Sequence, residues 1–149
     1  MTRHMPSARV SVVWFAAAML AMLMLAPAAA GNPHFVYVNV DRVGDTLEVS
    51  AKEAGLGNET QVVWEVSALA ECVNRGGNKP TADNKDAVSV SVTVPVQNGR
   101  AERSADDPIV LDGAAQIDPK CSPPMRMVYS DVTVTDVTHG VVYEVAGTF

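Results

Sequence analysis

Apolar and polar residues alternate along most of the chain beyond residue 30, which is the pattern of β-strands with one buried face. The longest example runs from Gln61 to Cys72, and its inward positions are Val62, Trp64, Val66, Ala68, Ala70 and Cys72. Ala87 to Val96 repeats it, with valines on one face and Ser89, Ser91 and Thr93 on the other. Since no stretch of useful length has the 3.6-residue period of a helix, the pattern predicts an all-β chain.

Shorter runs predict further strands at Phe35 to Asp41, Thr46 to Lys52, Arg100 to Ser104, Ile109 to Leu111, Met127 to Val137 and Val141 to Ala146. The apolar residues expected to share a face in three of them are Val36, Val38 and Val40, then Leu47, Val49 and Ala51, then Val128, Val132 and Val134. Asn98-Gly99 predicts a type I′ hairpin turn. Pro95 has no N–H to donate, so it predicts a sheet edge.

About seven short strands with one buried face each predict a two-sheet sandwich over residues 31–149. Composition agrees, because this segment has 22 Val against four Leu and two Ile, and β-branched residues favour strands. We expect an immunoglobulin-like Greek-key topology, with a closed barrel or a jelly roll as the alternative. The likeness is architectural, because the spacing of Trp64, Cys72 and Cys121 is not that of immunoglobulin domains.

Residues 1–30 predict a secretory signal peptide. Two arginines precede an apolar run from Val10 to Ala26, and Ala28-Ala29-Ala30 supplies the small residues that signal peptidase accepts. A retained membrane anchor is the alternative, since the run approaches the length of a bilayer span. The predicted signal peptide has no Arg-Arg pair and is not followed by a lipid-anchor cysteine. We therefore expect Sec export and a secreted, extracellular protein.

Residues 31–149 carry nine basic and 17 acidic residues, a formal charge of −8. This balance excludes a binder of the nucleic-acid backbone, which needs clustered Lys and Arg. It also disfavours adsorption to anionic membrane surfaces, so no membrane contact is expected after signal cleavage.

Cys72 and Cys121 are the two cysteines of the chain. In an oxidising compartment, such a pair predicts one structural disulfide. Neither cysteine has the neighbouring His or second Cys that a zinc site or a redox thiol requires.

Three segments resemble a group of small exported proteins of actinobacteria and fungi, for which we know no established function. They are the KEAGLGN motif at Lys52–Asn58, the CVNRGGN motif at Cys72–Asn78 and the stretch Tyr129–Asp136. The resemblance implies export, one β domain and a Cys72–Cys121 bridge, and it implies no catalytic chemistry.

Gly44–Val49 and the following Ala54-Gly55-Leu56 are more loosely similar to the secreted carrier proteins of the neocarzinostatin type. That resemblance implies an acidic immunoglobulin-like domain that holds a small apolar ligand. A carrier of this kind needs a cleft, for which Trp64, Tyr129 and Tyr143 are the candidate lining residues. The chain departs from that family in having one pair of cysteines where the family has two disulfides.

Two glycine- and asparagine-rich loops are the candidate binding sites, at Lys52–Asn58 and Asn74–Asp86. Glycines allow a backbone to present N–H groups to a ligand, and Arg75, Lys79 and Lys85 add positive charge. The alternative is a strand corner and a solvated loop. The candidate binding positions are Gly55, Gly57, Asn58, Asn74, Arg75, Gly76, Gly77, Asn78 and Lys79.

Other candidate sites are weaker. Calcium would need the side-chain oxygens of Asp83, Asn84 and Asp86, or of Asp106, Asp107 and Asp112, and neither set follows a calcium-loop pattern. His34 and His139 lack metal-ligand spacing, so no metal or cofactor is expected, and a two-histidine site formed through space is the alternative. Asn58-Glu59-Thr60 is an N-glycosylation sequon that matters only in a eukaryotic source.

No motif of a hydrolase or nucleotide-binding enzyme occurs in the sequence. We therefore expect a secreted, non-catalytic binding protein whose partner is an extracellular protein, a glycan or a small molecule. The alternative is a carrier for a small apolar ligand, and a hydrolase is the third hypothesis.

Overall fold

The computed structural model describes residues 31–74, 85–117, 121 and 125–149. The predicted signal peptide at residues 1–30 and most of the predicted loop between Asn74 and Asp86 lie outside this part of the chain. None of the described residues belongs to a helix that is long and apolar enough to cross a bilayer.

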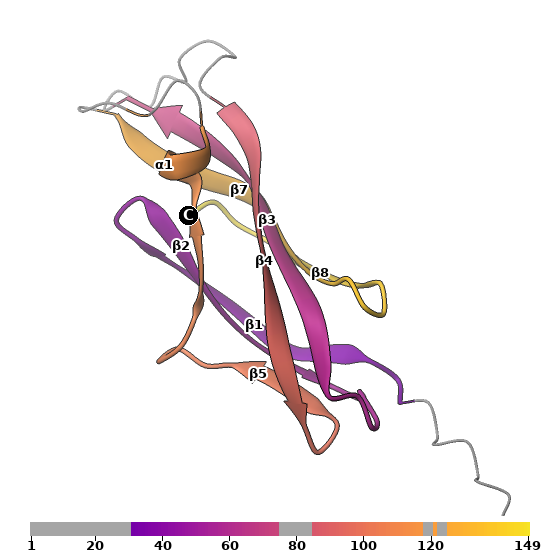
Figure 1. Cartoon of the computed structure of the whole chain (residues 1–149). Helices are drawn as coiled ribbons and strands as arrows, with labels where there is room; N and C mark the ends of the chain where they lie inside the picture. The colour runs from indigo at the N-terminus through magenta and orange to yellow at the C-terminus, as the bar shows by residue number, and fades with distance from the viewer. Residues whose placement is uncertain (1–30, 75–84, 118–120, 122–124) are drawn as a thin grey trace, which may run out of the picture.

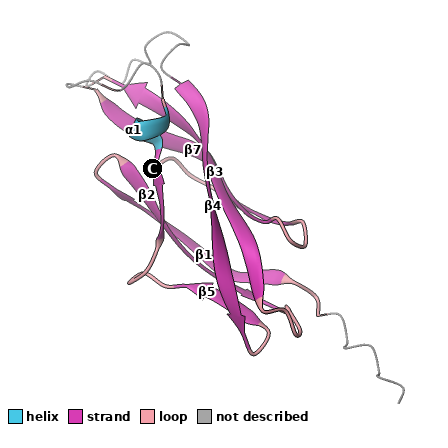
Figure 2. Cartoon of the chain, in the orientation of Figure 1, coloured by secondary structure: helices cyan, strands magenta, loops and turns pink. Residues whose placement is uncertain are grey.

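The described residues form an all-β fold, as predicted (Figure 2). A single helical turn, α1, at Gly113–Gln116 is the exception. The strands are β1 (His34–Val43), β2 (Thr46–Ala54), β3 (Gln61–Val73), β4 (Lys85–Gln97), β5 (Arg100–Arg103), β6 (Ile109–Asp112), β7 (Arg126–Asp136) and β8 (Val141–Val145).

All pairings among these strands are antiparallel, in the order β1-β2-β5-β4-β3-β7-β8, with β6 also pairing with β2. The strands form two facing layers, one of β1, β2, β5 and β6 and one of β4, β3, β7 and β8 (Figure 1). The layers are joined where Val96 of β4 pairs with Ala101 of β5. Because β1 and β8 also lie against each other, the sheet closes almost into a barrel.

The core lies between the two layers and follows the predicted alternation. The inward residues of β3, from Val62 to Cys72, are all buried, and so are Leu47, Val49 and Ala51 of β2. Trp64 and Tyr129 are the largest fully buried side chains of the described residues. Alternation therefore predicted the buried faces of β2 and β3 correctly.

The predicted face of the first strand is wrong at Val36. The register of β1 against β2 shifts between Phe35 and Tyr37, which is a β-bulge. A bulge inverts the alternation, so Phe35 packs on the core with Val38 and Val40, whereas Val36 is 55% exposed.

The predicted face of β7 is wrong at Val128 for the same reason. The pairing with β3 shifts between Ser67 and Leu69, and Asp131 opposite this shift has φ = 51°. Tyr129 is consequently buried on one side of the shift and Val132 on the other, with Val128 on the opposite face.

The turn between β4 and β5 has the predicted conformation. Asn98 has φ = 53° and Gly99 has φ = 71°, and a type I′ turn requires positive φ at both positions. Pro95 lies near the end of β4, where the strand passes from one layer to the other.

The predicted disulfide between Cys72 and Cys121 is confirmed. Their Cα atoms are 5.6 Å apart, and Cys72 is fully buried at the end of β3. The bond joins β3 to the segment that precedes β7, across a sequence separation of 49 residues.

We expect the double replacement Cys72→Ala with Cys121→Ala to lower the free energy of unfolding by about 4 kcal/mol, because the link restricts the unfolded chain. Urea denaturation of both proteins measures the change. Dithiothreitol should destabilise the parent protein by a similar amount and leave the double variant unaffected. Equal stability of the oxidised parent protein and the double variant would contradict a structural role for the bond.

Candidate functional site

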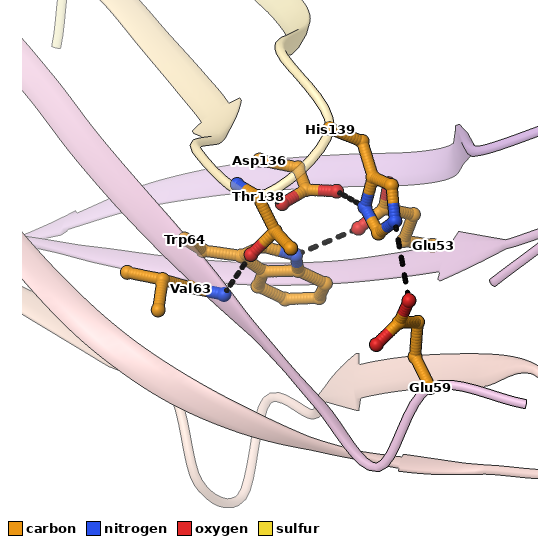
Figure 3. Close-up of polar contacts among 7 residues, drawn as sticks. All are labelled: Glu53, Glu59, Val63, Trp64, Asp136, Thr138 and His139. Atoms are coloured by element: carbon orange, nitrogen blue, oxygen red, sulfur yellow. Dashed lines mark hydrogen bonds and ion pairs between the residues drawn. The ribbon is translucent and has the colours of Figure 1, made fainter.

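A buried polar cluster lies where β2 ends, β3 begins and β7 ends. Its members are Glu53, Trp64, Asp136 and His139 (Figure 3). Glu53 follows Ala51 at the inward phase of β2, and Asp136 occupies the last inward position of β7. Strand periodicity thus brings two acidic side chains into the core.

Glu53 is fully buried, and one of its carboxylate oxygens has a donor. The Trp64 Nε1–H donates to Oε2 of Glu53 over 2.8 Å. Oε1 of the same carboxylate accepts no hydrogen bond from the described residues. A buried carboxylate oxygen without a donor is costly, because it has lost its hydration without replacement.

Asp136 is also fully buried, and it organises the turn between β7 and β8. Oδ1 accepts from the Thr138 backbone N–H over 2.8 Å, and Oδ2 lies 2.5 Å from His139 Nδ1. The Thr138 hydroxyl accepts from the backbone N–H of Val63 over 2.9 Å, which ties the turn to β3. The imidazole of His139 is therefore held beside the carboxylates.

His139 forms the solvent-facing side of the cluster. Its side chain is 25% exposed, and Nε2 lies 4.0 Å from Oε1 of Glu59, an exposed residue between β2 and β3 (Figure 3). Glu59 is therefore a polar neighbour of the cluster on its solvent-facing side.

Burial raises the pKa of Glu53 from 4.5 to about 7. The Trp64 hydrogen bond opposes this shift. The nearby Asp136 carboxylate reinforces it, because two buried negative charges repel and because Asp136 hydrogen-bonds to the protonated Glu53 carboxyl. Protonated His139 lowers the pKa of Glu53. Near neutral pH the Glu53 carboxyl therefore exists in both protonated and ionised forms.

Sequence reasoning did not identify Glu53 or Asp136 and treated His139 as an isolated turn residue. One signal was present, because both acids occupy the inward phase of an alternating strand, two positions beyond a buried apolar residue. The spacing could not reveal the partners, since Trp64 and His139 reach the acids from other parts of the chain.

The predicted binding loop at Lys52–Asn58 forms a rigid corner. Gly55 has φ = 81°, and a Cβ there would lie 2.1 Å from the Asn32 carbonyl oxygen, so the position requires glycine. Gly57 has φ = 58°, and Leu56 is buried and donates its N–H to the Gly99 carbonyl over 3.1 Å. Asn58 is exposed on this corner.

The second predicted loop begins at the other end of the molecule. Asn74 follows the last residue of β3, whereas the corner precedes the first, and a 13-residue strand spans about 40 Å (Figure 1). The remaining candidate positions of this loop, Arg75, Gly76, Gly77, Asn78 and Lys79, lie outside the described residues. The described end of the second loop, at Asn74, is therefore far from the corner.

A polar hollow of about 330 Å³ lies beside the corner, on the outer surface where β2, β4 and β5 meet. Its lining residues are Lys52, Pro95, Gln97, Asn98, Arg100 and Glu102. Lys52 donates to Glu102 over 2.8 Å, and the Tyr37 hydroxyl donates to the other Glu102 oxygen over 3.0 Å. Lys52 lies opposite Tyr37 of β1 and opposite Glu102 of β5 in the strand register, so the three side chains form one row across β1, β2 and β5.

The other predicted sites have different roles where the structure describes them. Asp107 pairs with Arg103, Asp112 caps α1, and Asp86 accepts from the next backbone N–H, so none of these acids joins a described cation cluster. Asp83 and Asn84 lie outside the described residues. His34 contacts the Asn32 carbonyl.

The aromatic residues expected to line a carrier cleft are mostly in the core. Trp64 and Tyr129 are both fully buried, and Tyr143 alone of the three is exposed, at 39%. A second hollow, of about 420 Å³, is lined by residues 131–133 and 144–147, none of them aromatic.

Comparisons of the chain with protein-family models, with curated proteins and with solved structures gave no match. The candidate sites are therefore judged by their geometry and chemistry.

In a buffer containing a chelator, we expect the free energy of unfolding to fall as the pH rises from 5 to 8. The pKa of Glu53 in the folded protein, about 7, lies above the ordinary value of 4.5. The stability linked to this group is therefore complete below pH 4.5 and is lost as the pH rises through 7. Urea denaturation at several pH values measures the trend.

Glu53→Gln should flatten this pH dependence, because the amide keeps the shape of the side chain and does not ionise. Glu144→Gln, on the exposed face of β8, is the matched control and should follow the parent protein. Parallel curves for the parent and Glu53→Gln would show that Glu53 does not titrate in this range.

Proposed function

We propose that this chain is an exported, non-catalytic binding protein with an immunoglobulin-like sandwich scaffold, and that it binds a polar extracellular ligand, a glycan, in the hollow beside the corner. The observation that carries the proposal is the set of charged and amide side chains around this hollow, of which Lys52 and Glu102 are held by hydrogen bonds. The disulfide is compatible with an oxidising extracellular compartment.

The hollow has the mixed hydrogen-bonding chemistry that a saccharide requires. The amides of Gln97 and Asn98 donate and accept, Lys52 and Arg100 donate, and Glu102 accepts. Lys52 and Tyr37 hold Glu102 in place, and these hydrogen bonds together with the positive charge of Lys52 lower the pKa of the Glu102 carboxyl. A carboxylate fixed in this way is a preorganised acceptor, which reduces the entropy lost on binding.

The backbone around the hollow is also rigid. The corner is bonded to the β4–β5 turn through Leu56 and Gly99, and the Val96 N–H donates to the Thr60 carbonyl over 2.9 Å. Binding residues placed on such a scaffold keep their geometry between the free and bound states. The carrier alternative has less support, because two of its three expected lining residues are buried in the core.

A glycan array probed with the purified protein tests the proposal. We expect Lys52→Ala and Arg100→Ala each to weaken binding of a positive glycan about tenfold or more, because each removes a charge-assisted hydrogen bond. Isothermal titration with that glycan measures the loss.

Arg126→Ala removes a positively charged side chain from an exposed position at the start of β7, and it should bind like the parent protein. The proposal would be overturned if no glycan bound to the parent protein, or if all three variants bound the glycan with equal affinity. Binding of an extracellular protein through the same residues would replace the glycan by a protein ligand.

A further inference from the structure

The buried cluster of Glu53, Asp136 and His139 has the composition of a transition-metal site. One potential ligand atom from each residue lies within 4.8 Å of the others. Zinc bonds to N and O ligands are about 2.0 to 2.2 Å long, and in the tetrahedral geometry of zinc two ligands of one ion are about 3.4 Å apart. Side-chain movements of about 1 Å would therefore bring the three ligands to one ion.

An independent observation points to a missing ligand in this cluster. Oε1 of Glu53 is buried and accepts no hydrogen bond from the described residues, although Oε2 of the same carboxylate accepts from Trp64. In the described part of the chain, it is one of two buried side-chain polar atoms with no partner, the other being Nε of Arg103. A cation would replace the lost hydration of this oxygen.

The charge of the cluster supports the same conclusion. Two fully buried carboxylates face each other, and the imidazole of His139 is positive only when it carries a proton. A divalent cation would neutralise both carboxylates and would bind a neutral imidazole, the form that coordinates metals.

We propose that Glu53, Asp136 and His139 together bind one divalent transition cation of the zinc class. An imidazole nitrogen with two carboxylates favours zinc over calcium and magnesium, which prefer sites built from oxygen ligands alone. Oε1 of Glu59 lies 4.0 Å from Nε2 of His139, on the solvent side of these three residues. This inference is independent of the glycan hollow, whose residues lie on the outer face.

The position of His139 allows the change that binding requires. Its Nδ1 lies 2.5 Å from Asp136 Oδ2, which is a hydrogen-bond distance and is shorter than the separation between two ligands of one ion. The ring must therefore shift or present its other nitrogen to the metal. It lies on a turn and is one-quarter exposed, so it can move without disturbing the core.

A bound cation would link the two layers of the fold. Glu53 comes from the end of β2 in one layer, whereas Asp136 and His139 come from the end of β7 and the following turn in the other. Binding should therefore stabilise the folded protein as well as occupy the cluster.

Titration of the EDTA-treated and dialysed protein with zinc chloride tests the proposal. We expect one ion per chain by calorimetry, and a Tm that rises by about 5 °C or more at a zinc concentration of about a hundred times Kd. Cobalt(II) should give the visible absorption of a protein-bound ion, and calcium or magnesium at the same concentration should leave the Tm unchanged.

Glu53→Gln and His139→Gln should each weaken zinc binding at least tenfold and abolish the visible cobalt spectrum, while Glu144→Gln should bind like the parent protein. Glu53→Gln keeps an acceptor for Trp64, so its fold should persist, and circular dichroism checks this for each variant. The proposal would be overturned if the parent protein did not bind zinc, or if both cluster variants bound zinc as tightly as the parent protein. It would also be overturned if calcium stabilised the protein as much as zinc does. Lys52→Ala and Arg100→Ala should retain zinc binding, which separates this test from that of the glycan hollow.

Discussion

The inward face of β3 is the constraint on which the rest of the structure depends. β3 is hydrogen-bonded to β4 on one side and to β7 on the other, and its alternate residues from Val62 to Cys72 are buried between the two layers. The same face supplies the indole of Trp64, which is both the largest core side chain and the donor to the buried Glu53. The apolar core and the polar cluster are therefore built on one strand.

Alternation was sufficient to predict the strands and failed where a bulge changes its phase. The first strand reads Phe35-Val36-Tyr37-Val38, so an apolar residue stands at every position and no polar side chain marks the inversion. In β7 the adjacent polar residues Ser130 and Asp131 do interrupt the alternation, and they mark the shift that moves Val128 to the other face. A bulge can therefore be recognised from side-chain types only when the two faces of the strand differ in polarity.

The candidate site was harder to predict, because residue type and strand phase disagree there. Glu53 and Asp136 are acids, which alone suggests solvent, and both occupy inward positions. The indole N–H of Trp64 and the imidazole of His139 provide polar partners for the two buried carboxylates. These contacts depend on the fold, so the sequence pattern does not reveal them. The glycines of the KEAGLGN motif, in contrast, are explained locally by the positive φ of the corner.

The near-closure of the sheet has a mechanical consequence. Where β1 meets β8, aromatic rings bridge the two edges, with Phe35 and Tyr143 centroids 6.2 Å apart, and no backbone ladder joins the described residues of these strands. The edge between β1 and β8 in the nearly closed sheet is therefore held by side-chain contacts. Local unfolding should begin at this edge, before the central strands that are hydrogen-bonded to β3 separate.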